Sequence, residues 1–505
     1  MFVHFGPNTW QEREYDDLSL APADIMQAIE PAQWADTALT MGARYIVLVA
    51  KHTGGFCLWQ TETTEYSIKG SPWRGGRGDV VAELSQACAA RGLQLGVYLS
   101  PRDDKHGAGL SGTCATPQAQ AAYDALYRRQ LTELLTRYGP ITELWLDGSS
   151  VVPTGDIVAQ HAPNAMVFQG PQATIRWVGN EDGFAPYPCW NSLDAQDAGT
   201  GIATAMHGDP EGDAWMPVEV DVSIRRPNWF WSTTNDKNLL SLDDLVEIYY
   251  RSVGRGAQLL LNVTPDRTGR IPPVDADRAA AFGEEIRLRF SRPVSETTNV
   301  GRDTLLGWPE PQRVDHVVLQ EELARGERVR AWRLDGLAWG RWQQLGAGSA
   351  IGHKQIVPIR PDGYTVLRLR VTASVDEPLI RRLAAFNVGA APPRTWRDPP
   401  PSLWADDAVG GWTGDSLALD LTPKVPTAAL YRLRLVAADG APVEVRDLDF
   451  RVDQGPQPTL VRNAPGRGDV VLISLPVTGR TVTLRARVRG AAKGTALLRQ
   501  ARPAR

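Results

Sequence analysis

Two carboxylic acids follow apolar segments in a way that could bring them to one pocket. Asp147 comes directly after an apolar run ending in Leu146, and the small Gly148 lets the backbone turn away behind it. Glu181 follows a second short segment, residues 176–178. Glycoside hydrolysis needs such a pair, because an oxocarbenium-like transition state requires one carboxylate beside the anomeric carbon and one carboxylic acid beside the leaving oxygen. With Asp147 as nucleophile, we expect the carboxyl groups about 5 to 5.5 Å apart and retention of configuration.

Each of these residues also has an ordinary structural interpretation. An Asp at a strand end is more often a helix cap or turn former than a nucleophile, and Glu181 could belong to a surface turn. His4 and His52, which follow other apolar segments, could be hydrogen-bonded core residues. Several polar residues at the ends of different segments favour the catalytic interpretation, but by themselves they indicate only an enzyme with a carboxylate pair.

The first part of the chain has the pattern of repeated βα units. Short apolar, β-branched runs alternate with longer amphipathic stretches from residue 1 to about 287, which predicts a (β/α)8-type barrel that is irregular around residues 165–235. The expected strands are 2–5, 45–50, 93–99, 141–146, 165–168, 176–178, 218–222 and 258–263. The expected helices are 31–41, 79–91, 118–138, 242–253 and 275–287. In such a barrel the residues at the carboxyl ends of the strands form the active site.

The texture changes after residue 288 to short alternating strands separated by polar turns. We therefore predict a multidomain α/β chain: a catalytic barrel at 1–287, a β-sandwich at 288–390, a Pro-rich linker at 391–405 and a second β-sandwich at 406–505.

Composition excludes several classes of partner. The chain is 43% hydrophobic and 22% charged, and it has no apolar run near the roughly 18 residues of a membrane span. The formal net charge is -4 and basic residues are scattered, so nucleic acid is not an expected partner. The four cysteines show no C-x-x-C spacing, which argues against a zinc site and a disulfide framework. The sequence makes no prediction of oligomeric state.

The N-terminus shows no export signal, since residues 1–6 already look like a structural strand. A core strand that begins at residue 2 is unusual for a barrel. We therefore expect the natural reading frame to begin upstream, which leaves a periplasmic or secreted location open.

Several segments, in order, resemble the α-L-fucosidases of glycoside hydrolase family 29. They are FVHFGPNT at 2–9, KHTGGFCLW at 51–59, GDVV at 78–81, ELWLDG at 143–148, RWVGNE at 176–181, and LLLNVTPD at 259–266 with GRIP at 269–272. Where this chain has KHTGGFCLW at 51–59, the family has K-H-H-D-G-F-C-L-W. Where it has WLDG at 145–148, the family has W-F-D-G. The resemblance covers residues 1 to about 285.

The resemblance implies a role for each matching residue. It makes Asp147 the nucleophile and lets His4 and His52 bind fucose hydroxyls, with Trp59 and Trp229 as apolar platforms. Glu181 is the implied acid/base, because RWVGNE is similar to the segment that carries this Glu in the family branch with narrower α-1,3/1,4 linkage preference. Glu219 is the alternative acid/base.

The chain departs from the family pattern at two adjacent positions. Thr53 and Gly54 replace the usual His and Asp, which removes one imidazole from the expected pocket. The change could loosen recognition of a fucose hydroxyl or alter which deoxy-sugar is preferred. Leu146 in place of Phe is a milder difference.

The resemblance therefore implies a retaining, exo-acting α-L-fucosidase that acts on a fucosylated oligosaccharide or glycoconjugate and needs no metal or organic cofactor. The expected β-sandwich at 288–390 resembles galactose-binding-like sandwiches, and its role could equally be docking against the barrel. Two alternatives stay open: a barrel glycosidase for a related sugar such as an α-galactoside, and a catalytically inactive carbohydrate-binding protein.

Overall fold

The computed structural model describes residues 1–193, 208–390, 407–421, 429–439, 441–452, 459–463, 470–475 and 481–503. These residues form two compact units. The first holds the described residues up to 390, apart from 186–188 and 208–209. Those two short stretches and the described residues from 407 onward form the second unit. No helix in the described ranges is long and apolar enough to cross a membrane.

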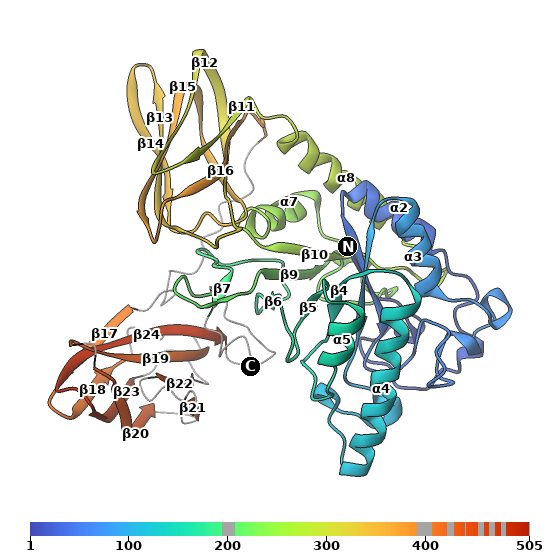
Figure 1. The fold of residues 1–505 in the computed structure, drawn as a ribbon. Coiled ribbons are helices and arrows are strands. Elements are labelled where there is room, and N and C mark those ends of the chain that lie inside the picture. Colours follow the sequence, from blue (N-terminus) through green and yellow to red (C-terminus); the bar gives the residue numbers. More distant parts are fainter. Residues whose placement is uncertain are drawn as a thin grey trace. The chain divides into compact units, whose positions relative to one another are not determined.

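The first unit is built on a parallel eight-stranded sheet that closes almost completely (Figure 1). Its strands run in the order β5-β4-β3-β2-β1-β10-β9-β6, and the parallel bridge between Phe168 and Ile175 links the two ends. The strands are β1 (Phe2–Val3), β2 (Tyr45–Lys51), β3 (Gln94–Leu99), β4 (Ile141–Trp145), β5 (Met166–Phe168), β6 (Arg176–Trp177), β9 (Val218–Ser223) and β10 (Gln258–Asn262). All eight strands expected from the sequence are confirmed.

Helices lie along the outside of this sheet (Figure 1). The longer ones are α2 (Pro31–Met41), α3 (Val80–Ala90), α4 (Pro117–Arg137), α7 (Leu242–Arg251) and α8 (Pro273–Phe290), and shorter ones are α1 (Pro7–Gln11) and α5 (Gly155–His161). Their starts carry local signals that the sequence already contained. Asp79 caps α3 by accepting from the amide of Ala82, and Ser241 opens α7 with a capping box. The five expected helices are confirmed.

The barrel is irregular where the sequence predicted it to be. Between β6 and β9 the described residues include a small antiparallel pair, β7 (Ser192–Leu193) with β8 (Ala214–Trp215). Strand β6 itself has only two residues. The barrel wall beside Glu181 therefore depends on side-chain contacts more than on backbone pairing.

A six-stranded antiparallel sheet completes the first unit. Its order is β11-β16-β12-β15-β13-β14, formed by β11 (Ser295–Val300), β12 (Asp303–Glu321), β13 (Val329–Ala338), β14 (Arg341–Gly348), β15 (Gln355–Ser374) and β16 (Leu379–Phe386). Tyr250 of α7 packs with Val318, Ile356 and Phe386 of this sheet, and its hydroxyl lies 2.9 Å from Nε2 of His316. The sheet is thus anchored to the barrel by an apolar contact.

The second unit is all-β and has its own core, which includes Trp412, Leu433 and Leu484. Its sheet contains β17 (Asp407–Thr413), β18 (Ser416–Asp420), β19 (Ala429–Ala437), β20 (Glu444–Val452), β21 (Thr459–Asn463), β22 (Val470–Leu475), β23 (Val482–Arg489) and β24 (Lys493–Pro503). The expected fold class, a barrel followed by β-rich domains, is confirmed. The expected linker at 391–405 lies outside the described residues, and the division into three domains stays a prediction.

One buried ion pair joins the ends of β2 and β3 beside the pocket. Nζ of Lys51 lies 2.9 Å from Oδ2 of Asp103, and neither side chain is exposed. Nζ also donates to Oε1 of Gln130 at 3.0 Å, and the His106 amide donates to Asp103. Gly55 is required next to this pair, because its φ is +92° and a Cβ there would lie 2.3 Å from Asp103 Oδ1.

We predict that Asp103→Asn lowers the free energy of unfolding of the first unit by about 3 to 5 kcal/mol, because it leaves the Lys51 charge buried without its partner. Denaturant unfolding followed by tryptophan fluorescence would measure this. Burial alone would raise the pKa of Asp103, but Lys51 and His106 outweigh it and hold this pKa well below the usual value. The ionised form is thus stabilised by folding.

The difference in free energy of unfolding between wild type and Asp103→Asn should accordingly have its full size above about pH 4. It should shrink as the pH falls toward the pKa of Asp103 in the folded protein. Glu83→Gln is the matched control, since it breaks the more exposed pair between Arg74 and Glu83. An equal loss of stability in both variants would contradict the importance of the buried pair.

Candidate active site

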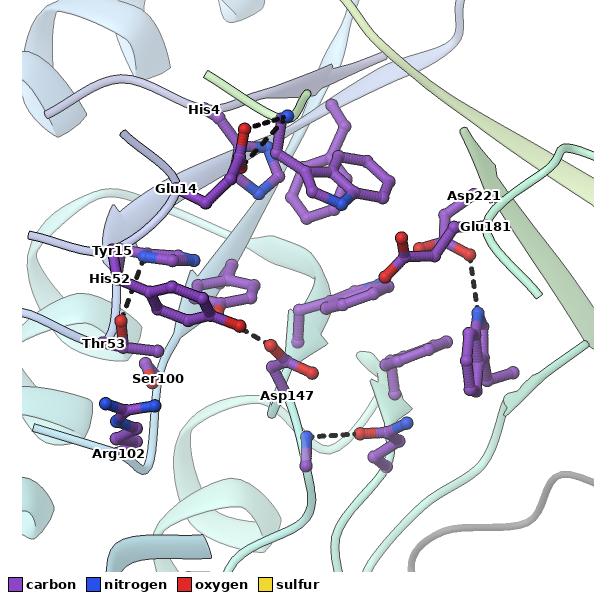
Figure 2. Close-up of a pocket in the computed structure, with 18 of the residues that line it drawn as sticks. His4, Glu14, Tyr15, His52, Thr53, Ser100, Arg102, Asp147, Glu181 and Asp221 are labelled. Carbon is purple, nitrogen blue, oxygen red and sulfur yellow. Dashed lines mark hydrogen bonds between the residues drawn. The ribbon is translucent and has the colours of Figure 1, made fainter. Parts of the chain in front are cut away.

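A cavity of about 390 Å³ opens at the carboxyl ends of the barrel strands (Figure 2). Five of the residues singled out from the sequence line it, namely His4, His52, Asp147, Glu181 and Trp229. Four of them come shortly after β1, β2, β4 and β6, and Trp229 lies in the loop after β9. Only closure of the barrel brings them together. Trp59 and Glu219 do not line it.

Asp147 follows β4 and presents its carboxyl to the cavity. The Tyr98 hydroxyl donates to its Oδ2 at 3.1 Å, and the Gly148 amide donates to Oε1 of Gln169 at 2.7 Å, which secures the turn behind it. Asp147 has exposed surface, and it lines the cavity. Desolvation nevertheless raises the pKa of Asp147, and the charge of Glu181 adds to this, while the hydrogen bond from Tyr98 opposes it.

Glu181 lies in the loop after β6, with 43% of its side chain exposed. The Arg226 guanidinium lies 3.6 Å from its Oε2 and 3.0 Å from Oδ1 of Asp182. In Figure 2, Glu181 and Asp221 lie on one side of the cavity, while His52, Thr53 and Arg102 lie on the other. Glu181 is the more exposed of these two acids, since only 3% of the surface of Asp221 is exposed.

The two histidines are uncharged at neutral pH. Burial lowers the pKa of His4 well below its usual value, and burial with the nearby Arg102 lowers that of His52 to about 3. Nδ1 of His4 lies 3.0 Å from Oδ1 of Asn262, whose amide nitrogen donates to the backbone oxygen of Trp229. Because Asn262 Oδ1 can only accept, His4 carries its proton on Nδ1, which leaves Nε2 as an acceptor.

Trp229 is held at the cavity by Glu14, which the sequence did not single out. Both carboxylate oxygens of Glu14 lie 3.1 Å from the Trp229 amide nitrogen, and Oε1 also accepts from Asn228 at 3.2 Å. The Trp229 ring is half-buried, with its centroid 5.1 Å from that of His4. An aromatic surface and a carboxylate therefore meet on one side of the cavity.

Trp59 is not a sugar platform, which corrects the expectation from the sequence. Its side chain has no exposed surface, and its Nε1 donates to Oε2 of Glu133 on α4 at 2.7 Å. The isolated bridges between Lys51 and Cys57 and between Cys57 and Ser67 fold this segment back against the barrel. The segment that begins at the pocket with His52 thus ends in the core.

Glu219 also lies away from the cavity, in the interior of the barrel. Its Oε1 accepts from Nε1 of Trp145 at 2.7 Å and its Oε2 from the Tyr45 hydroxyl at 3.3 Å. It has no exposed surface. The reason is its place on β9, where Asp221 lies two residues nearer the carboxyl end and reaches the cavity instead.

Sequence reasoning did not predict several cavity residues with titratable or hydroxyl groups, and three of them, Glu14, Tyr98 and Asp221, contact other residues of the site. Two of these three carried a usable signal. Tyr98 and Asp221 are polar residues inside apolar strands, and side chains alternate along a strand, so Glu219 and Asp221 had to share one face of β9. Glu14 lies in a loop, and its sequence neighbourhood carried no comparable signal.

The departure at Thr53 and Gly54 has a structural counterpart. A Cβ at Gly54 would lie 2.5 Å from Cβ of Asp16, whose Oδ2 accepts from the Tyr66 hydroxyl at 2.6 Å. Asp16 thus occupies the space that a side chain at position 54 would need. The Thr53 hydroxyl lies 3.3 Å from Nδ1 of His52, so it orients the histidine ring.

Among the residues described here, no group of three or more His, Cys, Asp and Glu side chains has a geometry that could hold a metal ion.

Comparisons with known proteins agree with this architecture. The sequence model of the family described as alpha-L-fucosidase matches residues 3–288. A putative alpha-L-fucosidase 1 of Oryza sativa subsp. japonica is 34% identical over 439 residues, which cover 76% of this chain and 82% of the relative. The alpha-L-fucosidase 1 of Arabidopsis thaliana is 32% identical, over 76% of this chain and 84% of its own length.

Solved structures give the same result. A putative alpha-L-fucosidase from Bacteroides thetaiotaomicron VPI-5482 superposes with a TM-score of 0.71 at 31% identity, covering 76% of this chain and 95% of that one. Another, from Bacteroides ovatus, has a TM-score of 0.69 at 27% identity and covers 98% of this chain and 93% of its own. With the family match spanning more than half of its residues, the chain belongs to the alpha-L-fucosidase family of glycoside hydrolases.

Proposed function

We propose that this chain is a retaining, exo-acting α-L-fucosidase that removes terminal α-linked L-fucose from oligosaccharides or glycoconjugates. One observation carries the proposal: Asp147 and Glu181, which lie far apart in the sequence, open onto one cavity at the carboxyl ends of the barrel strands. A cavity of about 390 Å³ suits one terminal sugar and part of the next residue.

The proposed reaction is a double displacement. Asp147 attacks the anomeric carbon while Glu181 gives its proton to the leaving oxygen, so that the glycosidic bond breaks and a β-fucosyl ester forms. The ionised Glu181 then takes a proton from water, which attacks the same carbon and releases Asp147. Two inversions return the α configuration. The Tyr98 hydroxyl supports the Asp147 carboxylate before the attack and after the release.

Neutral hydrogen-bonding groups and one aromatic ring support recognition of fucose. His4 offers Nε2 as an acceptor, and the uncharged His52 can donate or accept through its free nitrogen. Trp229 offers an apolar surface for the C6 methyl group that distinguishes fucose from galactose. The Glu14 carboxylate beside it is a strong acceptor for ring hydroxyls.

The finer proposal is a preference for α-1,3 and α-1,4 linkages. It is supported by the RWVGNE segment that carries Glu181 and by the partly exposed position of this residue at the cavity opening, where a branched leaving group has room.

The proposal is tested by comparing 4-nitrophenyl α-L-fucoside, a Lewis-type trisaccharide, an α-1,2-fucosylated disaccharide and 4-nitrophenyl α-D-galactoside. We expect release of fucose from the first two and at least about tenfold lower kcat/KM on the last two, because a lost pocket contact costs at least about 1.4 kcal/mol. Turnover of the galactoside alone would favour the related-sugar alternative. Glycan binding without any release would favour the inactive binding protein.

Asp147→Gly should lower kcat by about three orders of magnitude or more while the fold is kept, because no group is left to form the ester. Added azide should restore part of the turnover from the vacated side and yield a β-fucosyl azide. Glu181→Gly is the matched control, because azide should attack the ester from the opposite face and yield an α-fucosyl azide. The same anomer from both variants would contradict the assignment of the two roles.

The pH dependence of kcat/KM should show an acid limb above the ordinary Asp value of about 3.9. Asp147 must be ionised to attack, and its burial raises its pKa. Activity is therefore gained as the pH rises through this raised value. Measurement of kcat/KM on 4-nitrophenyl α-L-fucoside from about pH 3 to about pH 9, the range in which carboxyl groups and histidines titrate, would locate the acid limb. A limb at or below the ordinary value would contradict an Asp147 nucleophile in this environment.

A further inference from the structure

The cavity contains a third carboxyl group that the reaction above does not use. Asp221 lies on β9 and lines the same cavity as Asp147 and Glu181 (Figure 2), although only 3% of its surface is exposed. A carboxyl group in such a position needs compensation, because charge removed from water is costly. Its surroundings therefore indicate which protonation state it adopts and which neighbour it serves.

Trp177 fixes one oxygen of this carboxyl group. Its Nε1 donates to Asp221 Oδ1 at 2.6 Å, between the neighbouring strands β6 and β9. Trp177 is the last residue of β6, and the loop that follows carries Glu181. The backbone pairing between β6 and β9 is short, because β6 has only two residues. Its last backbone hydrogen bond to β9 runs from the Val178 amide to the Glu219 carbonyl at 3.0 Å. The Trp177–Asp221 hydrogen bond thus ties the base of the Glu181 loop to the barrel wall.

Asp221 carries a proton at neutral pH. Burial raises its pKa to about 8 despite the hydrogen bond from Trp177, and the charges of Glu181 and Asp147 contribute to the rise. Glu219, two residues earlier on β9, is a further acidic neighbour, and Arg226 and Asp182 act on Glu181 from the outer side. A neutral carboxyl whose Oδ1 accepts from Trp177 has its other oxygen free to hold the proton and donate it in a hydrogen bond.

The charge balance of the double displacement gives this neutral acid a role. Before the first step Asp147 is negative and Glu181 is protonated. After it Asp147 is an uncharged ester and Glu181 is negative, so one negative charge has moved between them. An ionised Asp221 would place a second negative charge beside the new carboxylate, whereas a neutral Asp221 can donate a hydrogen bond to it.

We infer that Asp221 is a positioning residue for Glu181: Trp177 holds one carboxyl oxygen, and the protonated other oxygen supports the Glu181 carboxylate that forms when the leaving group is protonated. This inference rests on the proposed function. It assigns Trp177 a role as well, since the indole N–H leaves Asp221 with a single oxygen for the proton. The hydrogen-bonded pair of Trp177 and Asp221 thus holds the loop after β6 in the position that Glu181 needs for proton transfer.

The test compares Asp221→Ala and Asp221→Asn with wild type and Glu181→Gln on two substrates. One is a Lewis-type trisaccharide, whose leaving sugar needs a proton, and the other is 4-nitrophenyl α-L-fucoside, whose leaving group does not. We expect Asp221→Ala to lower kcat/KM at least about tenfold more on the trisaccharide than on the aryl fucoside, in the same direction as Glu181→Gln. Asp221→Asn should stay within about threefold of wild type on both substrates, because its amide accepts from Trp177 and donates to Glu181.

Several outcomes would overturn the inference. If Asp221→Asn falls as far as Asp221→Ala, a neutral donor is not what the site needs. An equal loss on both substrates, or no loss in Asp221→Ala, would show that Asp221 does not act through Glu181. Wild-type enzyme that hydrolyses neither fucoside would overturn the proposed function and this inference with it, whereas activity with an unaffected Asp221→Ala would overturn the inference alone.

A second measurement covers the case in which Asp221→Ala does not fold. The infrared difference spectrum of wild type minus Asp221→Asn at pH 7 should contain the C=O stretch of a protonated carboxyl group, which should disappear as the pH is raised through about 8. Absence of this band would overturn the inference. Thermal unfolding of both variants would show in parallel whether the fold is kept.

Discussion

Four carboxyl groups, those of Glu14, Asp147, Glu181 and Asp221, line one barrel cavity, where they repel one another and are partly shielded from water. Much of the surrounding structure answers this constraint. The Tyr98 hydroxyl donates to Asp147, the Trp177 indole to Asp221, and the Trp229 amide to Glu14. Among the described residues, Arg226 is the one cation that forms an ion pair with a cavity carboxyl, that of Glu181, while Arg102 at the cavity pairs with Asp104 instead. Three of the four thus receive hydrogen bonds from neutral donors. Burial still raises the pKa of Asp221 to about 8, because its one donor does not offset the loss of hydration.

The histidines fit the same scheme. A charged imidazole in the cavity would attract the Asp147 carboxylate and weaken its nucleophilicity. Burial keeps His4 and His52 neutral, and Asn262 and Thr53 fix or orient their rings. The full charges needed for rigidity are placed one layer away, where Lys51 and Asp103 join β2 to β3 without facing the cavity. The scaffold therefore places its buried ion pair behind the site, while Tyr98, Asn262 and Thr53 position the side chains of Asp147, His4 and His52 through neutral hydrogen bonds.

The sequence predicted the barrel well because its signals are local. Apolar runs of strand length, helix caps such as Asp79 and Ser241, and turn glycines are each set by a few neighbouring residues. Asp147 could be predicted as the nucleophile for the same reason, because the carboxyl ends of barrel strands form the rim of the active site. Resemblance to a known family added the candidate roles of His4, His52 and Glu181, and all three residues line the cavity.

Trp59 and Glu219 show where such reasoning fails. Both belong to segments that reach the cavity, and both point into the core, because a side chain's surroundings depend on strand alternation and on chain reversals several residues away. The sequence by itself determined the strands, the helices and the order in which polar residues follow them. Only the tertiary structure decided which of those residues share a cavity and that Asp221, not Glu219, opens onto it. The physical reason is that burial and electrostatic coupling arise between residues distant in the chain, after the barrel has closed.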